Sequence, residues 1–339
     1  MEKLNIIQIG ICHEHAPGKF STLKKRPDLF NLIGYVDERD FCKTPWQTEL
    51  LSEKVFSDTR KLSLDEALDY PGLEAVTVEV PNNDLVPVAI KCMEHNLPMH
   101  MDKPAGEDLG LCKKLLDGCK AKNLPFQMGF MFRGNPAFRF CIRAIREKLI
   151  GEVFAIEADM NFCGGEAYQE YFGKFRGGIM YNLGCHLIDF VAAAMGRPNN
   201  VTSYLSSVSG YPDEIHNNCM AVLEYQHALV TLRTCSKGDP GRRTMKISGT
   251  DGFITFSPLE RFDGKSVEIE LALGKEKGAF PKGVHILRFP PQRDRYEVQL
   301  QEFVQVIRGT ARPSYSYEHD YLVHEMTLAA ANYTTWRKN

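Results

Sequence analysis

The first third of the chain alternates short apolar runs with helical patterns, and this alternation constrains the fold more than any other feature. Apolar runs of strand length occupy residues 4–11, 32–36, 75–80 and 98–101. After Pro81, apolar residues recur at the three- and four-residue spacing of a helix face. Strands that alternate with helices fold as right-handed βαβ units. The sequence therefore predicts an α/β fold that begins with a doubly wound, mostly parallel sheet.

Two further segments in this part predict helices between the strands. Ser63 and Glu66 have the spacing of a capping box, in which each residue satisfies a backbone N–H of the other. Apolar residues of the segment 109–119 recur at helical spacing. Both patterns agree with a βαβ architecture.

The pattern changes after about Gly151. Turn signals there separate strand-like segments with few helices between them, at 152–162, 201–208, 219–225, 228–235, 244–248 and 266–273. Closely spaced strands favour a mostly antiparallel sheet in a second, α+β domain. We therefore expect a dinucleotide-binding domain at 1–125 and a second domain at 126–339, with the final helix able to pack back on the first domain.

Composition excludes several classes of protein. With 41 basic and 43 acidic residues, the net charge of −2 gives no electrostatic footprint for nucleic acid. The best apolar run, residues 190–195, is far shorter than the roughly 20 residues of a membrane span. The ten cysteines form no CxxC pair, and the chain starts without the pattern of a signal peptide. We expect a cytoplasmic protein with reduced thiols and no membrane partner.

The loop after the first strand is where a doubly wound sheet binds a dinucleotide. The fingerprint is G-x-G-x-x-G, whose glycines let the backbone approach the pyrophosphate. Residues 10–15 read G-I-C-H-E-H, so only Gly10 matches. The small side chain of Cys12 leaves the backbone accessible, and His13 and His15 can donate hydrogen bonds to phosphate oxygens.

Asp37 follows the second strand, 22 residues after His15. An acidic side chain there accepts hydrogen bonds from the ribose hydroxyls and repels a 2′-phosphate. This position favours NAD over NADP as the cofactor, although the neighbouring Arg39 leaves NADP open. The alternative interpretation of Asp37 is a turn residue at the end of a strand.

Further segments carry a family resemblance over essentially the whole chain. In order, these are V-P-N at 80–82, D-K-P at 102–104, a joining segment at 127–138, GGIMYNLGCH at 177–186, and the closing segment 301–320. In their sequence and spacing they resemble the Gfo/Idh/MocA family, which includes glucose–fructose oxidoreductase and inositol dehydrogenase.

The resemblance implies a Rossmann domain followed by a domain with a large open sheet. It implies oxidation or reduction of a hydroxyl carbon of a sugar, polyol or sugar derivative with NAD or NADP. Because the open sheet of family members usually packs against another subunit, it also implies a homodimer or homotetramer. The matching cofactor-binding residues are Pro81, Asn82, Asp102 and Lys103.

Lys103 and His186 are the candidate catalytic residues. Transfer of a hydride from an alcohol carbon needs a base for the hydroxyl proton and a donor that stabilises the alkoxide. Lys103, at the carboxyl end of a strand, suits the donor, and His186 suits the base. Without the resemblance, Lys103 is a solvated surface lysine and His186 a core histidine.

Asn182 departs from the family pattern. It lies four residues before His186, where the family has an aspartate that raises the basicity of the histidine. Asparagine can position a substrate hydroxyl, but it carries no negative charge. A metal is not predicted, because His13, His15 and His186 lack the spacing of a ligand set.

Substrate contacts are expected mainly from the second domain. The polar candidates are Arg133, Asn161, Tyr168, Arg176 and Tyr181. The leading interpretation is an NAD-dependent dehydrogenase of carbohydrate-like substrates. Two alternatives stay open: a glycoside-cleaving enzyme that oxidises its substrate transiently with tightly held NAD, and a redox-inactive regulator that binds a nucleotide or a sugar.

Overall fold

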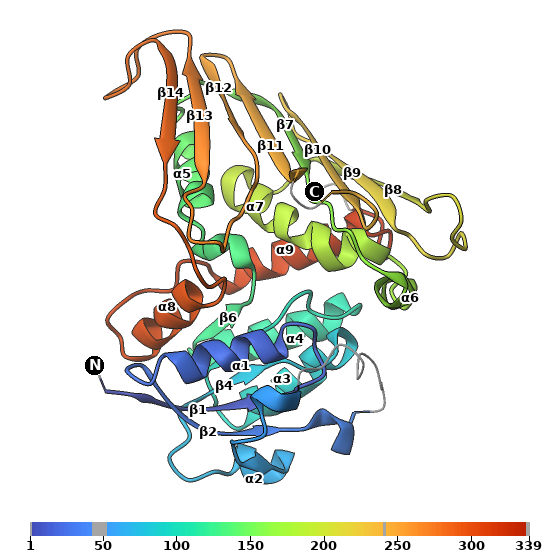
Figure 1. Ribbon diagram of the computed structural model, residues 1–339, viewed down its shortest axis with the longest axis vertical. Helices are drawn as coiled ribbons and strands as arrows, with labels where there is room; N and C mark the ends of the chain where they lie inside the picture. Colours follow the sequence, from blue (N-terminus) through green and yellow to red (C-terminus); the bar gives the residue numbers. More distant parts are fainter. Residues whose placement is uncertain (1, 43–52, 240–241, 337–339) are drawn as a thin grey trace. The chain divides into compact units, whose positions relative to one another are not determined.

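The computed structural model of the chain describes residues 2–42, 53–239 and 242–336 (Figure 1). The chain divides into two compact units. Unit one comprises Met1–Phe130 and Tyr296–Tyr321, and unit two comprises Met131–Arg295 and Leu322–Asn339. This division differs from the predicted boundary after residue 125, because the short strand Phe126–Met128 pairs with the first sheet.

Unit one contains a six-stranded parallel sheet, as the alternation of strands and helices predicts. Its strand order is β3-β2-β1-β4-β5-β6. The strands are β1 Leu4–Ile9, β2 Phe30–Val36, β3 Lys61–Leu62, β4 Ala75–Val78, β5 Met99–Met101 and β6 Phe126–Met128. The chain winds outward in both directions from the β1–β4 pair, which is the topological switch point where such sheets bind ligands.

Helices connect these strands and cover the sheet. They are α1 Ala16–Lys25, α2 Leu64–Leu68, α3 Asn82–Glu94, α4 Leu109–Ala121, α8 Glu297–Ile307 and the first turn of α9 Tyr317–Ala330. The predicted capping box is confirmed, since Ser63 accepts from the N–H of Glu66 and Glu66 accepts from that of Ser63. Buried apolar residues of β1 pack with Phe303 and Val304 of α8, which ties this late helix to unit one.

Unit two contains an eight-stranded, mostly antiparallel sheet of order β14-β13-β12-β11-β7-β10-β9-β8. The strands are β7 Val153–Asp159, β8 Asn200–Ser206, β9 Asn218–Glu224, β10 Leu229–Cys235, β11 Thr244–Gly249, β12 Gly252–Phe256, β13 Glu268–Leu273 and β14 Gly283–Arg288. β7 and β10 pair in parallel. β12 and β14 were not among the expected strands.

The sheet of unit two is covered by helices on one face. The helices are α5 Pro136–Arg146, α6 Glu166–Gly173 and α7 Cys185–Met195, and α5 packs against α7 beside the sheet (Figure 1). Along β9 and β10, alternate residues are buried. The opposite face exposes large apolar side chains, namely Tyr204, Met220, Leu229, Phe253, Val284 and Ile286. Across the described residues, every helix is too short or too polar to cross a bilayer.

Candidate functional site

The loop after β1 lies at the carboxyl edge of the sheet in unit one. Gly10 has a φ of +107°, and a Cβ at this position would lie 2.4 Å from the carbonyl carbon of Glu79. Side chains rarely adopt that φ, and none has room here. The glycine that remains from the fingerprint therefore lets the loop pass directly beside the end of β4.

The backbone N–H groups of this loop already have acceptors within unit one. The carboxylate of Glu38 accepts from the N–H groups of Ile11 and Cys12, each at 2.7 Å. The N–H of His13 donates to the carbonyl of Glu79 at 3.3 Å. In a complete glycine fingerprint, loop and helix N–H groups face the pyrophosphate. In this chain, these three N–H groups donate instead to Glu38 and to the carbonyl of Glu79.

Burial sets the protonation of Cys12 and Glu38. It raises the pKa of the Cys12 thiol to about 12, with the Glu38 carboxyl as a second cause. A neutral thiol is a weak nucleophile, so Cys12 is a small loop residue rather than a reactive one. Burial also raises the pKa of Glu38, although the two N–H groups oppose the shift. The sequence analysis missed Glu38.

Asp37 lies at the end of β2, as predicted, but its carboxylate is already paired. It accepts from Arg39 Nε at 2.9 Å and Nη2 at 2.7 Å, and from Lys61 Nζ at 3.2 Å. Partial burial opposes its ionisation, but the hydrogen bonds from Arg39 and Lys61 outweigh it and lower its pKa. A ribose hydroxyl at this position would compete for the Asp37 carboxylate with the side chains of Arg39 and Lys61.

A buried ion cluster lies beneath the loop. Lys19 of α1 has no exposed surface, and its Nζ lies 2.5 Å from Glu79 Oε1 and 3.3 Å from Asp102 Oδ2. Burial raises the pKa of Glu79 well above its usual range. Burial also opposes ionisation of Asp102, but the charge of Lys19 and the nearby histidines hold its pKa well below the usual range. Asp102 is therefore the anion of the cluster.

The two loop histidines flank Asp102. His15 Nδ1 lies 3.0 Å from Asp102 Oδ2, and His13 Nδ1 lies 3.5 Å from the same oxygen. His13 Nδ1 also accepts from the N–H of His15 at 3.2 Å. Burial lowers the pKa of His13 to about 3, so its ring is neutral near physiological pH. The two rings stand 4.9 Å apart.

Two groups of residues place metal-ligand atoms close together: His13, His15 and Asp102, and Cys12, Asp37 and Glu38. In the first group, His13 Nδ1 already accepts a backbone N–H, and Lys19 donates to the Asp102 oxygen that a metal would need. In the second, cations and backbone N–H groups hold both carboxylates. Because these contacts use the ligand atoms, neither group favours a metal.

The segment carrying Lys103 is tied to its neighbours through the backbone. The N–H of Lys103 donates to Asp102 Oδ1 at 2.6 Å, and Asn82 Nδ2 donates to the carbonyl of Lys103 at 3.0 Å. Lys103 is 1% exposed. Pro81, at the N-terminus of α3, directly precedes Asn82. Of the predicted cofactor residues, Asn82 and Asp102 thus position the backbone of Lys103.

In unit two, the segment before α7 is constrained by its glycines. Gly178 has a φ of +50°, and a Cβ there would lie 1.9 Å from the carbonyl oxygen of His216. Met180–Gly184 then forms a π turn that leads into α7. Such turns are frequent at functional sites. His186 follows in the first turn of α7 and is 2% exposed.

Asn182 lies within the π turn, and its Nδ2 donates to the hydroxyl of Tyr171 at 2.8 Å. Tyr171 belongs to α6 and is buried. The sequence analysis named Tyr168 of the same helix, which lies one helical turn earlier and packs against the ring of Phe162. Tyr171 differs from Tyr168 in its hydrogen bond with the amide of Asn182. No pattern in the sequence predicts this hydrogen bond.

The other predicted substrate residues of unit two do not converge. Arg133 is 4% exposed, and its Nη2 donates to Asp189 Oδ1 at 2.7 Å. The ring of Tyr181 packs between Phe175 and Tyr333. Arg176 is exposed, and Asn161 accepts through its carbonyl from Arg243. This placement favours a structural role for Arg133.

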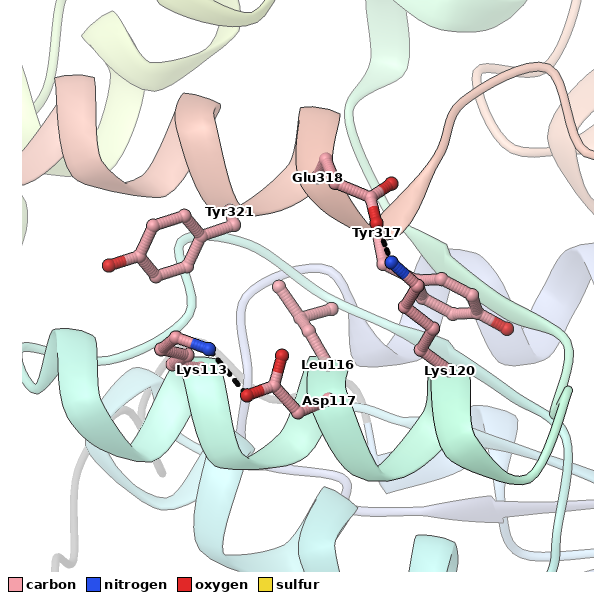
Figure 2. A pocket seen from close by; sticks show the side chains of 7 residues that line it. All are labelled: Lys113, Leu116, Asp117, Lys120, Tyr317, Glu318 and Tyr321. Carbon is pink, nitrogen blue, oxygen red and sulfur yellow. Dashed lines mark hydrogen bonds and ion pairs between the residues drawn. The ribbon is translucent and has the colours of Figure 1, made fainter.

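A hollow of about 240 Å³ lies on unit one between α4 and the start of α9 (Figure 2). In Figure 2, Lys113 pairs with Asp117, and Lys120 pairs with Glu318 across the two helices. These side chains are exposed and satisfy one another, and none of the predicted site residues lines the hollow. It is a surface feature apart from the candidate site.

Comparisons with known proteins agree with the fold. A model of the GFO/IDH/MocA C-terminal domain matches residues 138–255. An uncharacterized oxidoreductase of Schizosaccharomyces pombe is 29% identical over 219 residues, which cover 60% of this chain and 55% of that protein. The scyllo-inositol 2-dehydrogenase (NAD(+)) of Bacillus subtilis is 23% identical over 279 residues, 79% of this chain and 77% of that protein.

One solved structure with the same fold is an oxidoreductase from Agrobacterium radiobacter in complex with NAD+, L-tartaric acid and magnesium. Its TM-score is 0.78 at 17% identity, covering 98% of this chain and 96% of that one. The matched range of the domain model includes the segment at 177–186. Residues 138–255 of the chain thus match a GFO/IDH/MocA C-terminal domain.

Proposed function

We propose that the chain is an NAD-dependent oxidoreductase that transfers hydride between nicotinamide and a hydroxyl carbon of a sugar, polyol or sugar derivative. The observation that carries the proposal is Lys103, nearly buried and held by Asp102 and Asn82 at the carboxyl edge of a doubly wound sheet. The inositol dehydrogenase of Bacillus subtilis supports the same class of cofactor and substrate.

The residues of unit one fit a dinucleotide. The sheet has its switch point between β1 and β4, and Gly10 keeps the loop backbone close to that point. His13 Nε2 is buried and has no hydrogen-bond partner among the described residues. A buried polar nitrogen without a partner is costly, which marks the loop as a region built for something other than stability alone.

Each candidate residue has a role that follows from its chemistry. NAD, when bound, supplies the hydride acceptor. The ammonium of Lys103 stabilises negative charge on the substrate oxygen, and the imidazole of His186 takes the hydroxyl proton. Asn182, whose amide is oriented by Tyr171, positions the substrate hydroxyl or the imidazole of His186.

The acidic end of β2 supports NAD over NADP. Asp37 stands there, and its carboxylate would repel a 2′-phosphate. Arg39 and Lys61 compensate for Asp37, so the preference is expected to be moderate.

A test of the proposal is whether the chain catalyses reduction of NAD+ with a candidate substrate. The purified chain is incubated with NAD+ or NADP+ and a panel of inositols, anhydrosugars and aldoses, and reduced nicotinamide is followed by its absorbance. Production of NADH with one member of the panel supports the proposal. Tightly held NAD that survives purification, together with glycoside cleavage and no net NADH, would instead indicate transient oxidation. Binding without any chemistry would indicate a regulator.

Substitution Asn182→Asp is expected to keep or raise the rate of alcohol oxidation near neutral pH. The amide of Asn182 now donates to the hydroxyl of Tyr171 at 2.8 Å, whereas a carboxylate would accept the hydrogen of that hydroxyl. A nearby carboxylate also raises the basicity of an imidazole, which is the base in this proposal. The pH profile of kcat/KM measures the effect, with Asn199→Asp, at an exposed asparagine of unit two, as the control. A large loss of rate would show that the amide itself is required.

We also propose that the open face of the unit two sheet associates with a second copy of the chain, giving a homodimer or homotetramer. Leu229 is 57% exposed on this face, near further apolar residues of neighbouring strands. Exposed apolar patches of this kind mark association surfaces. Leu229→Glu should lower the mass measured by light scattering toward that of a monomer. The control Leu111→Glu, a similarly exposed leucine of α4, should leave the mass unchanged.

A cytoplasmic location fits the thiols. Each of the ten cysteines, all within the described residues, is free. Reduced thiols are typical of the cytoplasm.

A further inference from the structure

The pair formed by His15 and Asp102 is the feature of the loop that the proposed function leaves unexplained. His15 stands at the last position of residues 10–15, where the complete fingerprint has glycine. Its Nδ1 lies 3.2 and 3.0 Å from the two carboxylate oxygens of Asp102. Asp102 is buried and ionised, and an ionised carboxylate stabilises positive charge on the ring bonded to it.

The other donors near this position are already used or enclosed. The N–H groups of Ile11 and Cys12 donate to Glu38. His13 and Lys19 are 0% exposed. The side chain of His15 is 17% exposed, with Nδ1 turned to the buried carboxylate. The ring of His15 is thus more exposed than His13 and Lys19, and its Nε2 lies on the side away from Asp102, beside Glu14.

Four groups from three parts of unit one face the imidazole of His15. Asp102 follows β5, Glu14 and His13 belong to the loop, and the ring of Tyr296 stands 6.1 Å away before α8. Glu14 Oε1 lies 3.6 Å from His15 Nε2. Burial opposes ionisation of Glu14, but nearby positive charge, first that of His15, lowers its pKa. Two carboxylates thus stand beside the ring, one at each nitrogen.

Other ionisable groups of the described residues lie near His13 and His15. The cations are Lys19 and Lys103, and the anions are Asp102 and Glu14. Burial raises the pKa of Glu79, which pairs with Lys19. His13 is neutral. A proton on His15 would add one positive charge next to Asp102.

We propose that His15, protonated and held by Asp102, is the phosphate-binding cation of unit one, so that dinucleotide binding takes up a proton. This inference rests on the proposed function, which supplies the pyrophosphate. Nδ1–H stays on Asp102, and Nε2–H donates a charge-assisted hydrogen bond to a phosphate oxygen. Because the pyrophosphate favours the protonated ring, affinity rises as the pH falls and levels off once the ring is protonated without ligand.

Isothermal titration calorimetry measures the proton directly. The chain is titrated with NAD+ at one pH in several buffers that differ in ionisation enthalpy. We expect uptake of a fraction of a proton, at most about one per NAD+, and an affinity that falls severalfold between about pH 6 and about pH 8. ADP-ribose, which keeps the pyrophosphate, should take up the same fraction. Adenosine, which lacks it, should take up none.

Variants test whether His15 is the residue that takes up the proton when NAD+ binds. His15→Gln should abolish the uptake and weaken NAD+ binding about tenfold below neutral pH. His15→Lys carries a permanent charge, so it should keep the affinity and lose the uptake. His95→Gln is the matched control, because His95, at the C-terminal end of α3, also lies near a carboxylate, 3.7 Å from Asp69. It should change neither quantity.

The outcomes separate the two levels of the account. NAD+ binding without proton uptake, or uptake that persists in His15→Gln, would overturn the role of His15 and leave the proposed function standing. An absence of NAD+ binding at every pH would overturn both. Uptake that disappears in His15→Gln and His15→Lys but persists in His95→Gln supports the inference.

Discussion

Lys19→Met is expected to lower the free energy of unfolding by about 3–5 kcal/mol, because it leaves buried carboxyl groups without their cation. Lys19 has no exposed surface, and its ammonium lies 2.5 Å from Glu79 and 3.3 Å from Asp102. Methionine fills a similar volume, so the loss reports the charge rather than a cavity. Urea unfolding near neutral pH measures it.

The same helix offers a matched control. Lys24 of α1 also forms an ion pair, with Asp58, but both side chains are substantially exposed. Lys24→Met should cost no more than about 1 kcal/mol. The loss in Lys19→Met should also shrink as the pH falls toward about 4, where protonation of the carboxyl groups removes the buried charge. Equal losses in the two variants, independent of pH, would contradict the buried cluster.

Lys103→Met is expected to reduce kcat by about 10²- to 10⁴-fold while changing NAD+ affinity only a few-fold. The ammonium is proposed to stabilise charge that develops on the substrate oxygen, and such an interaction contributes mainly in the transition state. Steady-state kinetics with the substrate found in the panel, together with NAD+ titration, separate the two effects.

Lys113→Met is the control for this prediction. Lys113 is an exposed lysine of α4 that pairs with Asp117 (Figure 2). Its replacement should leave kcat unchanged. If Lys103→Met retained the full kcat, or lost NAD+ binding and kcat together, Lys103 would have no specific role in the chemistry.

Much of the fold follows from local patterns in the sequence. The longer strands of unit one, β1, β2 and β4, are mostly apolar. The capping box at Ser63 fixes the start of α2 through contacts within four residues. The strands β12 and β14 were not predicted. Residues of β14 are alternately exposed and partly buried, so this edge strand lacks a strong apolar face. β6 has three residues, too few for a period to show.

The candidate site was predictable where a residue lies next to a recognisable motif. Lys103 and Asn82 belong to short segments with a family pattern, and the structure brings them together. Glu38, Lys19 and Tyr171 were missed, because each acts through a partner that is distant in the sequence. Glu38 accepts from residues 26 and 27 positions away, and Lys19 reaches a carboxylate 60 positions away. Only the folded sheet makes such pairs neighbours.

The central claim is that unit one binds NAD in the loop after β1. Calorimetric titration of the purified chain with NAD+ and with NADP+ tests it most directly. The account predicts saturable binding of NAD+ with one site per chain, tighter than that of NADP+, and loss of binding in Gly10→Val, whose side chain would collide with the backbone of Glu79. Failure of both dinucleotides to bind a folded chain would contradict it.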